Sequence, residues 1–204
     1  MRAMIDRTER IDKFASALRT LITRSLQVNP VFADTAIVQS FAWYDDAHAY
    51  ALELSERYGL PLIVASGIVA AMSIRTRWDK NLADAELFLR GGKVKGLKIR
   101  VNKASALLDA EEHWNDDDVS WALKILGGRK IQSFAHNIMY HNASDKATID
   151  VWMCRAFGVE QNALKSGGLY DDCEQAVQRV AKELEMPVPA VQALVWILIR
   201  GKAE

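Results

Sequence analysis

The sequence predicts an all-α protein, and two observations carry this prediction. Apolar residues recur three and four positions apart in one segment after another, which is the spacing of a helix with one buried face. No segment shows the sustained alternation of apolar and polar residues that is typical of a half-buried strand. Half of the 204 residues are apolar, which is enough for a core in a chain of this size. We therefore expect a single all-α domain.

Residues that start or stop helices mark the bounds of each expected helix. Asp45 or Asp46 can start the second helix, which Gly59 and Pro61 close. The third helix is apolar almost all round, so we expect it to be the central buried helix. The expected helices cover residues 6–26, 45–58, 62–73, 78–89, 99–110, 119–126, 131–138, a segment starting at 148–150, and residues 170–184 and 188–200.

The dipeptide Gly127-Gly128 lies between two amphipathic runs and predicts a helical hairpin. Glycine permits a positive φ and leaves bare N–H groups that can approach a phosphate closely. After the second run, a polar loop leads to Thr148 and Asp150. Thr148 suits a helix N-cap, which would place Asp150 in the first turn of the next helix.

Four motifs in this part of the chain resemble those of a known family. Gly128-Arg129-Lys130 opens a helix and is followed by 149–155, Ile-Asp-Val-Trp-Met-Cys-Arg. Upstream stand 71–76, Ala-Met-Ser-Ile-Arg-Thr, and then Gly-Leu at 96–97 with Asn-Lys-Ala at 102–104. In this order they resemble the helix-hairpin-helix DNA glycosylases, the endonuclease III-like superfamily, from about Leu60 to Val159. The hairpin departs from the family's Leu-Pro-Gly-Val-Gly pattern, because it lacks the proline.

The resemblance implies a two-lobed helical glycosylase-like fold. Residues 60–150 would form a central lobe with the hairpin at 119–140, and residues 1–59 and 150–204 a second lobe, with the site in a cleft between them. Some relatives carry a four-cysteine iron–sulfur cluster. This chain has only Cys154 and Cys173 and no histidine spacing typical of a metal site, so we expect no cluster, metal or cofactor. It would be a divergent, phage-type member.

The resemblance assigns catalysis to Asp150 and Lys130. A carboxylate in a first turn is stabilised by the helix dipole, so we expect Asp150 to stay ionised and to stabilise a cationic sugar. The alternative is an ordinary helix cap. In relatives that also cut the DNA backbone, a lysine at the position of Lys130 attacks the sugar and forms a Schiff base. The alternative, a phosphate-contacting or solvated lysine, is equally open.

Further positions are expected to contact DNA. Arg75 stands where many relatives have a glutamine that fills the gap left by a flipped base, although it also suits a basic helix C-terminus. Trp152 could line the base pocket or belong to the core. The expected DNA contacts are Arg75, Thr76, Arg77, Gly127, Gly128, Arg129, Ser133, His136 and Asn137, and a basic face is expected from Arg90, Lys93, Lys95, Lys98, Arg100 and Lys103.

The resemblance thus implies a DNA glycosylase that flips a modified or damaged base out of double-stranded DNA, cleaves its N-glycosidic bond, and cuts the backbone if Lys130 is a nucleophile. One alternative is a base-modifying enzyme with this fold, as proposed for phage-encoded proteins. Another is a non-catalytic DNA-binding protein. The net charge of zero gives no general sign of nucleic-acid binding. Without a signal-peptide core or a long apolar run, we expect a cytoplasmic monomer that joins the nucleoid when bound to DNA.

Overall fold

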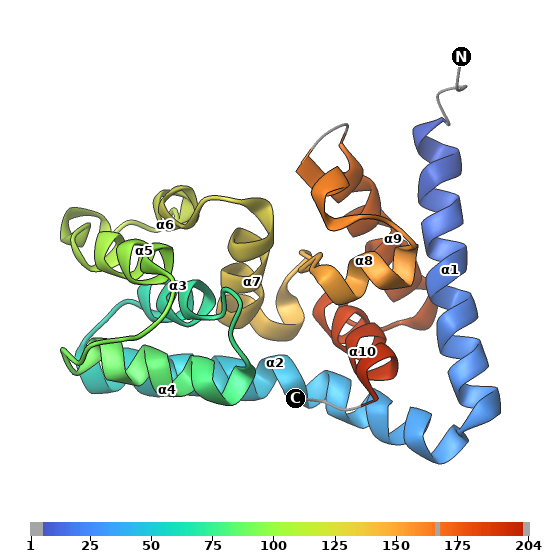
Figure 1. Cartoon of the computed structure of the whole chain (residues 1–204), viewed down its shortest axis with the longest axis horizontal. Coiled ribbons are helices and arrows are strands. Elements are labelled where there is room, and N and C mark those ends of the chain that lie inside the picture. Colours follow the sequence, from blue (N-terminus) through green and yellow to red (C-terminus); the bar gives the residue numbers. More distant parts are fainter. Residues whose placement is uncertain (1–5, 166–167, 202–204) are drawn as a thin grey trace. The chain divides into compact units, whose positions relative to one another are not determined.

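The computed structural model describes residues 6–165 and 168–201, and within these ranges every regular element is a helix. The all-α fold class is therefore confirmed. Figure 1 shows the elements, which are α1 (Arg7–Val28), α2 (Pro30–Tyr58), α3 (Leu62–Met72), α4 (Trp78–Leu89), α5 (Lys98–Leu108), η1 (Glu111–His113), α6 (Ser120–Leu126), α7 (Arg129–Tyr140), η2 (His141–Ala143), α8 (Val151–Phe157), η3 (Gln161–Lys165), α9 (Leu169–Leu184) and α10 (Val188–Arg200).

The chain divides into two compact units. Of the described residues, 6–44, 142–165 and 168–201 form unit 1, and Asp45–His141 form unit 2. The first boundary falls inside α2, so this helix contributes to both units. The boundaries expected from the sequence were near residues 60 and 150.

Unit 2 is built around α3, which packs against α4, α5, α6 and α7 (Figure 1). Ten of the eleven residues of α3 are buried. A helix buried on all sides has to be apolar on all sides. The prediction that this helix is the central buried one is confirmed. Gly67 allows α5 to pack closely against α3, since a Cβ at this position would lie 2.7 Å from Cδ1 of Leu107 in α5.

Unit 1 packs α1 along α9, with α8 and α10 completing the core. Phe14 of α1 meets Phe157 of α8 with ring centroids 5.0 Å apart. The fully buried carboxylate of Asp172 accepts hydrogen bonds from Nε of Arg7 at 2.7 Å and Nε of Arg10 at 2.6 Å. These charge-assisted bonds join the first turn of α9 to α1.

The sequence-based bounds of the second helix are wrong. The helix does not begin at Asp45 or Asp46, because α2 already runs from Pro30. Proline is well tolerated at a first helical position, where its missing N–H would have had no partner. The side chain of Asn29 accepts a hydrogen bond from the N–H of Phe32 at 3.2 Å. Asn29-Pro30 therefore ends one helix and starts the next.

Candidate functional site

Asp150 is the N-cap of α8. Its Oδ1 accepts hydrogen bonds from the backbone N–H groups of Trp152 at 2.9 Å and Met153 at 3.0 Å. The expected N-cap, Thr148, is wrong: its hydroxyl lies 3.3 Å from that of Tyr44 instead. Asp150 is only 8% exposed. A carboxylate held in this way lies at the positive end of the helix dipole.

The backbone that leads to Asp150 is buried and is held by side chains of α9. The N–H of Ala147 donates to Oε1 of Glu174 at 3.0 Å. The hydroxyl of Tyr170 accepts from the N–H of Ile149 at 3.2 Å and donates to the carbonyl of Ala147 at 3.0 Å. Buried backbone groups without a regular ladder need such partners. Tyr170 and Glu174 therefore fix the position of Asp150, a role that no local sequence signal indicated.

Trp152 lies half-buried beside Asp150 on α8. The guanidinium of Arg155 lies 4.2 Å from the centroid of its ring, and that of Arg200 lies 5.5 Å away. Arg200 also lies 5.0 Å from the ring of Trp196. Cations over aromatic faces are attracted by the ring quadrupole. The neighbourhood of Asp150 in unit 1 is thus both aromatic and cationic, and a base-binding role for Trp152 stays a prediction.

In unit 2, Gly127 and Gly128 join α6 to α7. Both have a positive φ, 48° and 70°, so each adopts a backbone conformation that favours glycine. The amine of Lys103 on α5 donates to the carbonyl of Leu126 at the end of α6. Burial lowers the pKa of Lys103. The turn is therefore anchored by α5, although a cation at a helix C-terminus is also a common stabilising arrangement.

Helix α7 carries the predicted catalytic lysine, Lys130, at its second position, together with four of the predicted DNA contacts, Arg129, Ser133, His136 and Asn137. Arg129 is exposed and Lys130 half-buried. Ser133 and Asn137 are buried, 6% and 0% exposed, because this face of α7 is covered. Their predicted contact with DNA stays a prediction, and it would require this face of α7 to become accessible. His136 is half-buried, with its ring centroid 4.5 Å from that of Tyr140.

Arg75, Thr76 and Arg77 lie between α3 and α4. Arg75 is exposed and has a φ of 54°, which is rare for a residue with a side chain. The hydroxyl of Thr76 donates to the carbonyl of Ile74 at 3.2 Å. Arg77 pairs with Asp79 at 2.7 Å. All three residues line an open pocket of unit 2.

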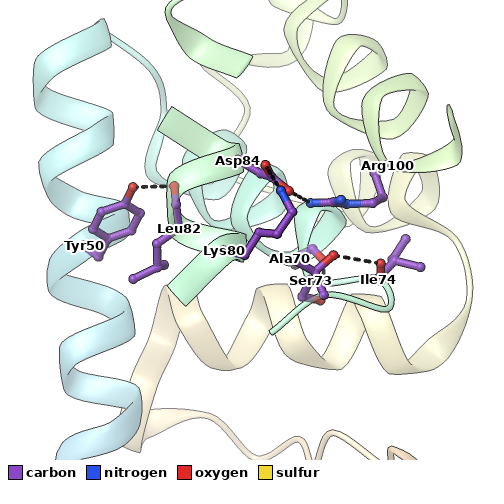
Figure 2. Close-up of polar contacts among 9 residues, drawn as sticks. Tyr50, Ala70, Ser73, Ile74, Lys80, Leu82, Asp84 and Arg100 are labelled. Carbon is purple, nitrogen blue, oxygen red and sulfur yellow. Dashed lines mark hydrogen bonds and ion pairs between the residues drawn. The ribbon is translucent and has the colours of Figure 1, made fainter. Parts of the chain in front are cut away.

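The predicted basic face needs correction. Arg90, Lys93, Lys95 and Lys98 are exposed, but Arg100 is 3% exposed. Figure 2 shows the cause: Arg100 of α5 and Lys80 of α4 both reach the buried carboxylate of Asp84, with N···O distances of 2.5 and 2.7 Å. Burial by itself would raise the pKa of Asp84, but the hydrogen bonds and charges of Lys80 and Arg100 outweigh it and lower that pKa. Arg100 is thus a structural cation.

The predicted catalytic residues belong to different units, Asp150 to unit 1 and Lys130 to unit 2. The structure brings Asp150 together with Trp152, and the glycine turn together with Lys103. Among the described residues, no group of three or more histidine, cysteine, aspartate or glutamate side chains could hold a metal ion. None of the described helices is long and apolar enough to span a membrane.

The fold and these sites define an all-α protein of two helical units, with a buried carboxylate at a helix N-terminus in one unit and a glycine-linked helix pair beside basic side chains in the other. The chain belongs to a family described as a family of unknown function (DUF7178), whose sequence model matches residues 10–203. No curated protein and no solved structure matches the chain.

Proposed function

We propose that this protein is a DNA glycosylase, which flips a modified or damaged base out of duplex DNA and releases it by cleaving its N-glycosidic bond. The observation that carries the proposal is the setting of Asp150. The carboxylate is 8% exposed and accepts hydrogen bonds from two N–H groups of α8. The backbone before it is hydrogen-bonded to a side chain of α9, so the carboxylate is fixed in position. Such fixed charges suit catalysis, because they need little reorganisation during the reaction.

Cleavage of an N-glycosidic bond is favoured by an anion next to the sugar. As the base leaves, positive charge develops on the sugar ring, and a fixed carboxylate stabilises it. Asp150 would perform this role or orient the attacking water. Trp152, under the guanidinium of Arg155, offers an aromatic face on which a flipped base could stack.

The turn between α6 and α7 would bind the DNA backbone. The N–H of Gly127 donates to the carbonyl of Leu123 at 3.1 Å and closes α6, whereas a Cβ at Gly128 would meet no atom within 4 Å, so a phosphate could approach the backbone at Gly128 closely. Exposed Arg129 adds positive charge at the start of α7. An open backbone segment next to a cation suits a phosphate. Lys130, one residue further, would be the nucleophile if the enzyme also cuts the backbone.

The test of the carboxylate is Asp150→Asn. Asparagine caps helices about as well as aspartate, so the variant should fold normally while losing the negative charge. Base release from duplexes carrying a panel of modified bases, read as alkali-sensitive abasic sites, should fall at least about a hundredfold, the order lost with an electrostatic group. Asp6→Asn is the matched control, since Asp6 caps α1 by accepting from the N–H of Thr8. Full base release by Asp150→Asn would rule out the proposed role.

The test of the lyase step is borohydride trapping of the Schiff base. Lys130→Gln should abolish the trapped adduct, whereas Lys124→Gln, at an exposed position in α6, should not. Base release without an adduct would leave a glycosylase in which Lys130 only contacts DNA. Intact DNA of altered mass would instead identify a base-modifying enzyme, and binding without any product a non-catalytic DNA-binding protein.

A further inference from the structure

Unit 2 contains an open pocket of about 490 Å³, a volume within the range of small-molecule binding sites. Its lining comes from two segments, residues 74–80 and 95–100. Both segments lead into a helix: α4 begins at Trp78 and α5 at Lys98. The residues before them, Arg77 and Leu97, make no side-chain cap bond to their helices. Two helix N-termini, which carry partial positive charge, therefore meet at one pocket.

The lining is strongly cationic. Five of the ten lining residues are basic and one, Asp79, is acidic; the basic residues are Arg75, Arg77, Lys80, Lys95 and Arg100. The buried carboxylate of Asp84 offsets one further charge by pairing with Lys80 and Arg100. A pocket with an excess of about three positive charges attracts anions.

Some of the basic residues that line the pocket pair with a carboxylate of the protein, and others do not. Arg77 pairs with Asp79. Within the described ranges, Arg75 and Lys95 have no ion pair or side-chain hydrogen bond, although both line the pocket and are exposed. Their charges remain available to a ligand.

Arg100 supplies an independent indication of a ligand. It lines the pocket, is 3% exposed, and donates from Nη2 to Asp84. Its buried Nε has no hydrogen-bond partner among the described residues. A Cβ at position 96 would lie 3.2 Å from Nη1 of Arg100, so a side chain there would crowd the guanidinium, and glycine does not. A buried, incompletely bonded guanidinium is costly unless an acceptor can reach it.

Arg75 is held in a conformation that its own backbone disfavours. Its φ of 54° lies in the left-handed region, which is sterically disfavoured for a residue with a Cβ. Such strain in an exposed, unpaired basic residue beside a pocket is typical of a functional position.

We propose that this pocket binds a phosphate group, with Arg75 and Lys95 as direct contacts, Arg100 as the buried cation behind them, and the N-terminus of α5 as an N–H donor. Phosphate fits because its oxygens accept from several directions at once, as these donors require. The group would belong to the DNA backbone or to a free nucleotide. The inference deepens the proposed function, and it rests on that proposal only for taking the phosphate to be that of DNA.

The experiment measures affinity for an unmodified duplex against salt concentration, together with amide NMR shifts on titration with deoxyadenosine monophosphate and inorganic phosphate. Arg75→Ala and Lys95→Ala should each weaken duplex binding roughly tenfold and lower the salt slope by about one. Lys13→Ala is the control, because Lys13 is an exposed cation of α1 outside the lining and outside the predicted DNA contacts. Arg75→Gly removes the guanidinium and the strain together, and so separates lost binding from altered folding.

Each outcome decides the point. Shifts at the amides of Lys98 and Ile99 with the monophosphate and with inorganic phosphate identify a nucleotide phosphate. Duplex binding that depends on Arg75 and Lys95, without such shifts, identifies a backbone phosphate. The inference is overturned if neither small phosphate shifts those amides and both alanine variants bind duplex like Lys13→Ala. Because the duplex is unmodified, failure of base release leaves these readings unaffected.

Discussion

Replacing Asp84 by asparagine should cost far more stability than replacing any exposed acid of the same helix. The side chains of Asp84 and Arg100 are 5% and 4% exposed, so the pair is shielded from water. Removing one charge leaves Arg100 buried without a counter-charge, which typically costs about 3–5 kcal/mol. Lys80, whose side chain is 56% exposed, can turn to solvent and adds little. The predicted loss therefore comes mainly from Arg100.

Urea unfolding followed by circular dichroism measures this loss. With a slope of about 2 kcal/mol per molar urea, a cost of 3–5 kcal/mol lowers the midpoint by roughly 2 M. Asp79→Asn is the matched control, because Asp79 lies on the same helix and its pair with Arg77 has side chains 66% and 85% exposed. It should change stability by less than about 1 kcal/mol. Equal midpoints for the two variants would refute the claim that the buried pair holds α4 against α5.

Three other substitutions and conditions give separate expectations. Because the pKa of Asp84 is lowered in the folded state, the stability that this carboxylate contributes is present above the ordinary carboxyl pKa of about 4 and is lost as the pH falls below it. The free energy of unfolding, measured from pH 3 to 7, should therefore fall less steeply with acid in Asp84→Asn than in the parent chain. Gly67→Ala should lower stability by about 1 kcal/mol, because crowding of Leu107 costs about 1–3 and better helix propensity returns about 1; in a Leu107→Ala background the same change should stabilise. Asp150→Ala should lose about 1 kcal/mol of cap energy, whereas Asp150→Asn should melt within a degree or two of the parent chain.

Helix positions could be predicted from the sequence where apolar spacing and capping residues agreed. The bounds of α4 and α10 match the expected 78–89 and 188–200, since Gly91-Gly92 follow the end of α4 and Pro187 and Pro189 mark the start of α10. The sequence does not predict the first half of α2, because Asn29-Pro30 also signals the end of a helix. The same dipeptide caps and starts the next helix, and buried Ala33, Ala36 and Ser40 continue its inward face. A proline signals a boundary but not which side of it is helical.

Burial of polar residues could not be predicted, because it depends on which helices meet. Ser133 and Asn137 look like a polar face in the sequence, yet both are covered. Tyr170 and Glu174 hold the backbone before Asp150 across 21 to 27 residues of chain. Spacing within one helix carries no information on such pairings.

The basic run between Arg90 and Lys103 illustrates what the structure adds to a charge count. In the sequence its six cations are equivalent, but Arg100 pairs with Asp84 and Lys103 bonds the end of α6. Within the described ranges, Lys95 has no ion pair and lines a pocket, as Arg75 does. Loss of a cation with an internal partner should therefore reduce stability first, and loss of an uncommitted one should reduce anion affinity alone. If a substitution at Arg100 weakened DNA binding, the loss of stability alone could account for it, so it would not show that Arg100 contacts DNA. The same result for a fully folded variant at Lys95 would show that Lys95 contacts DNA.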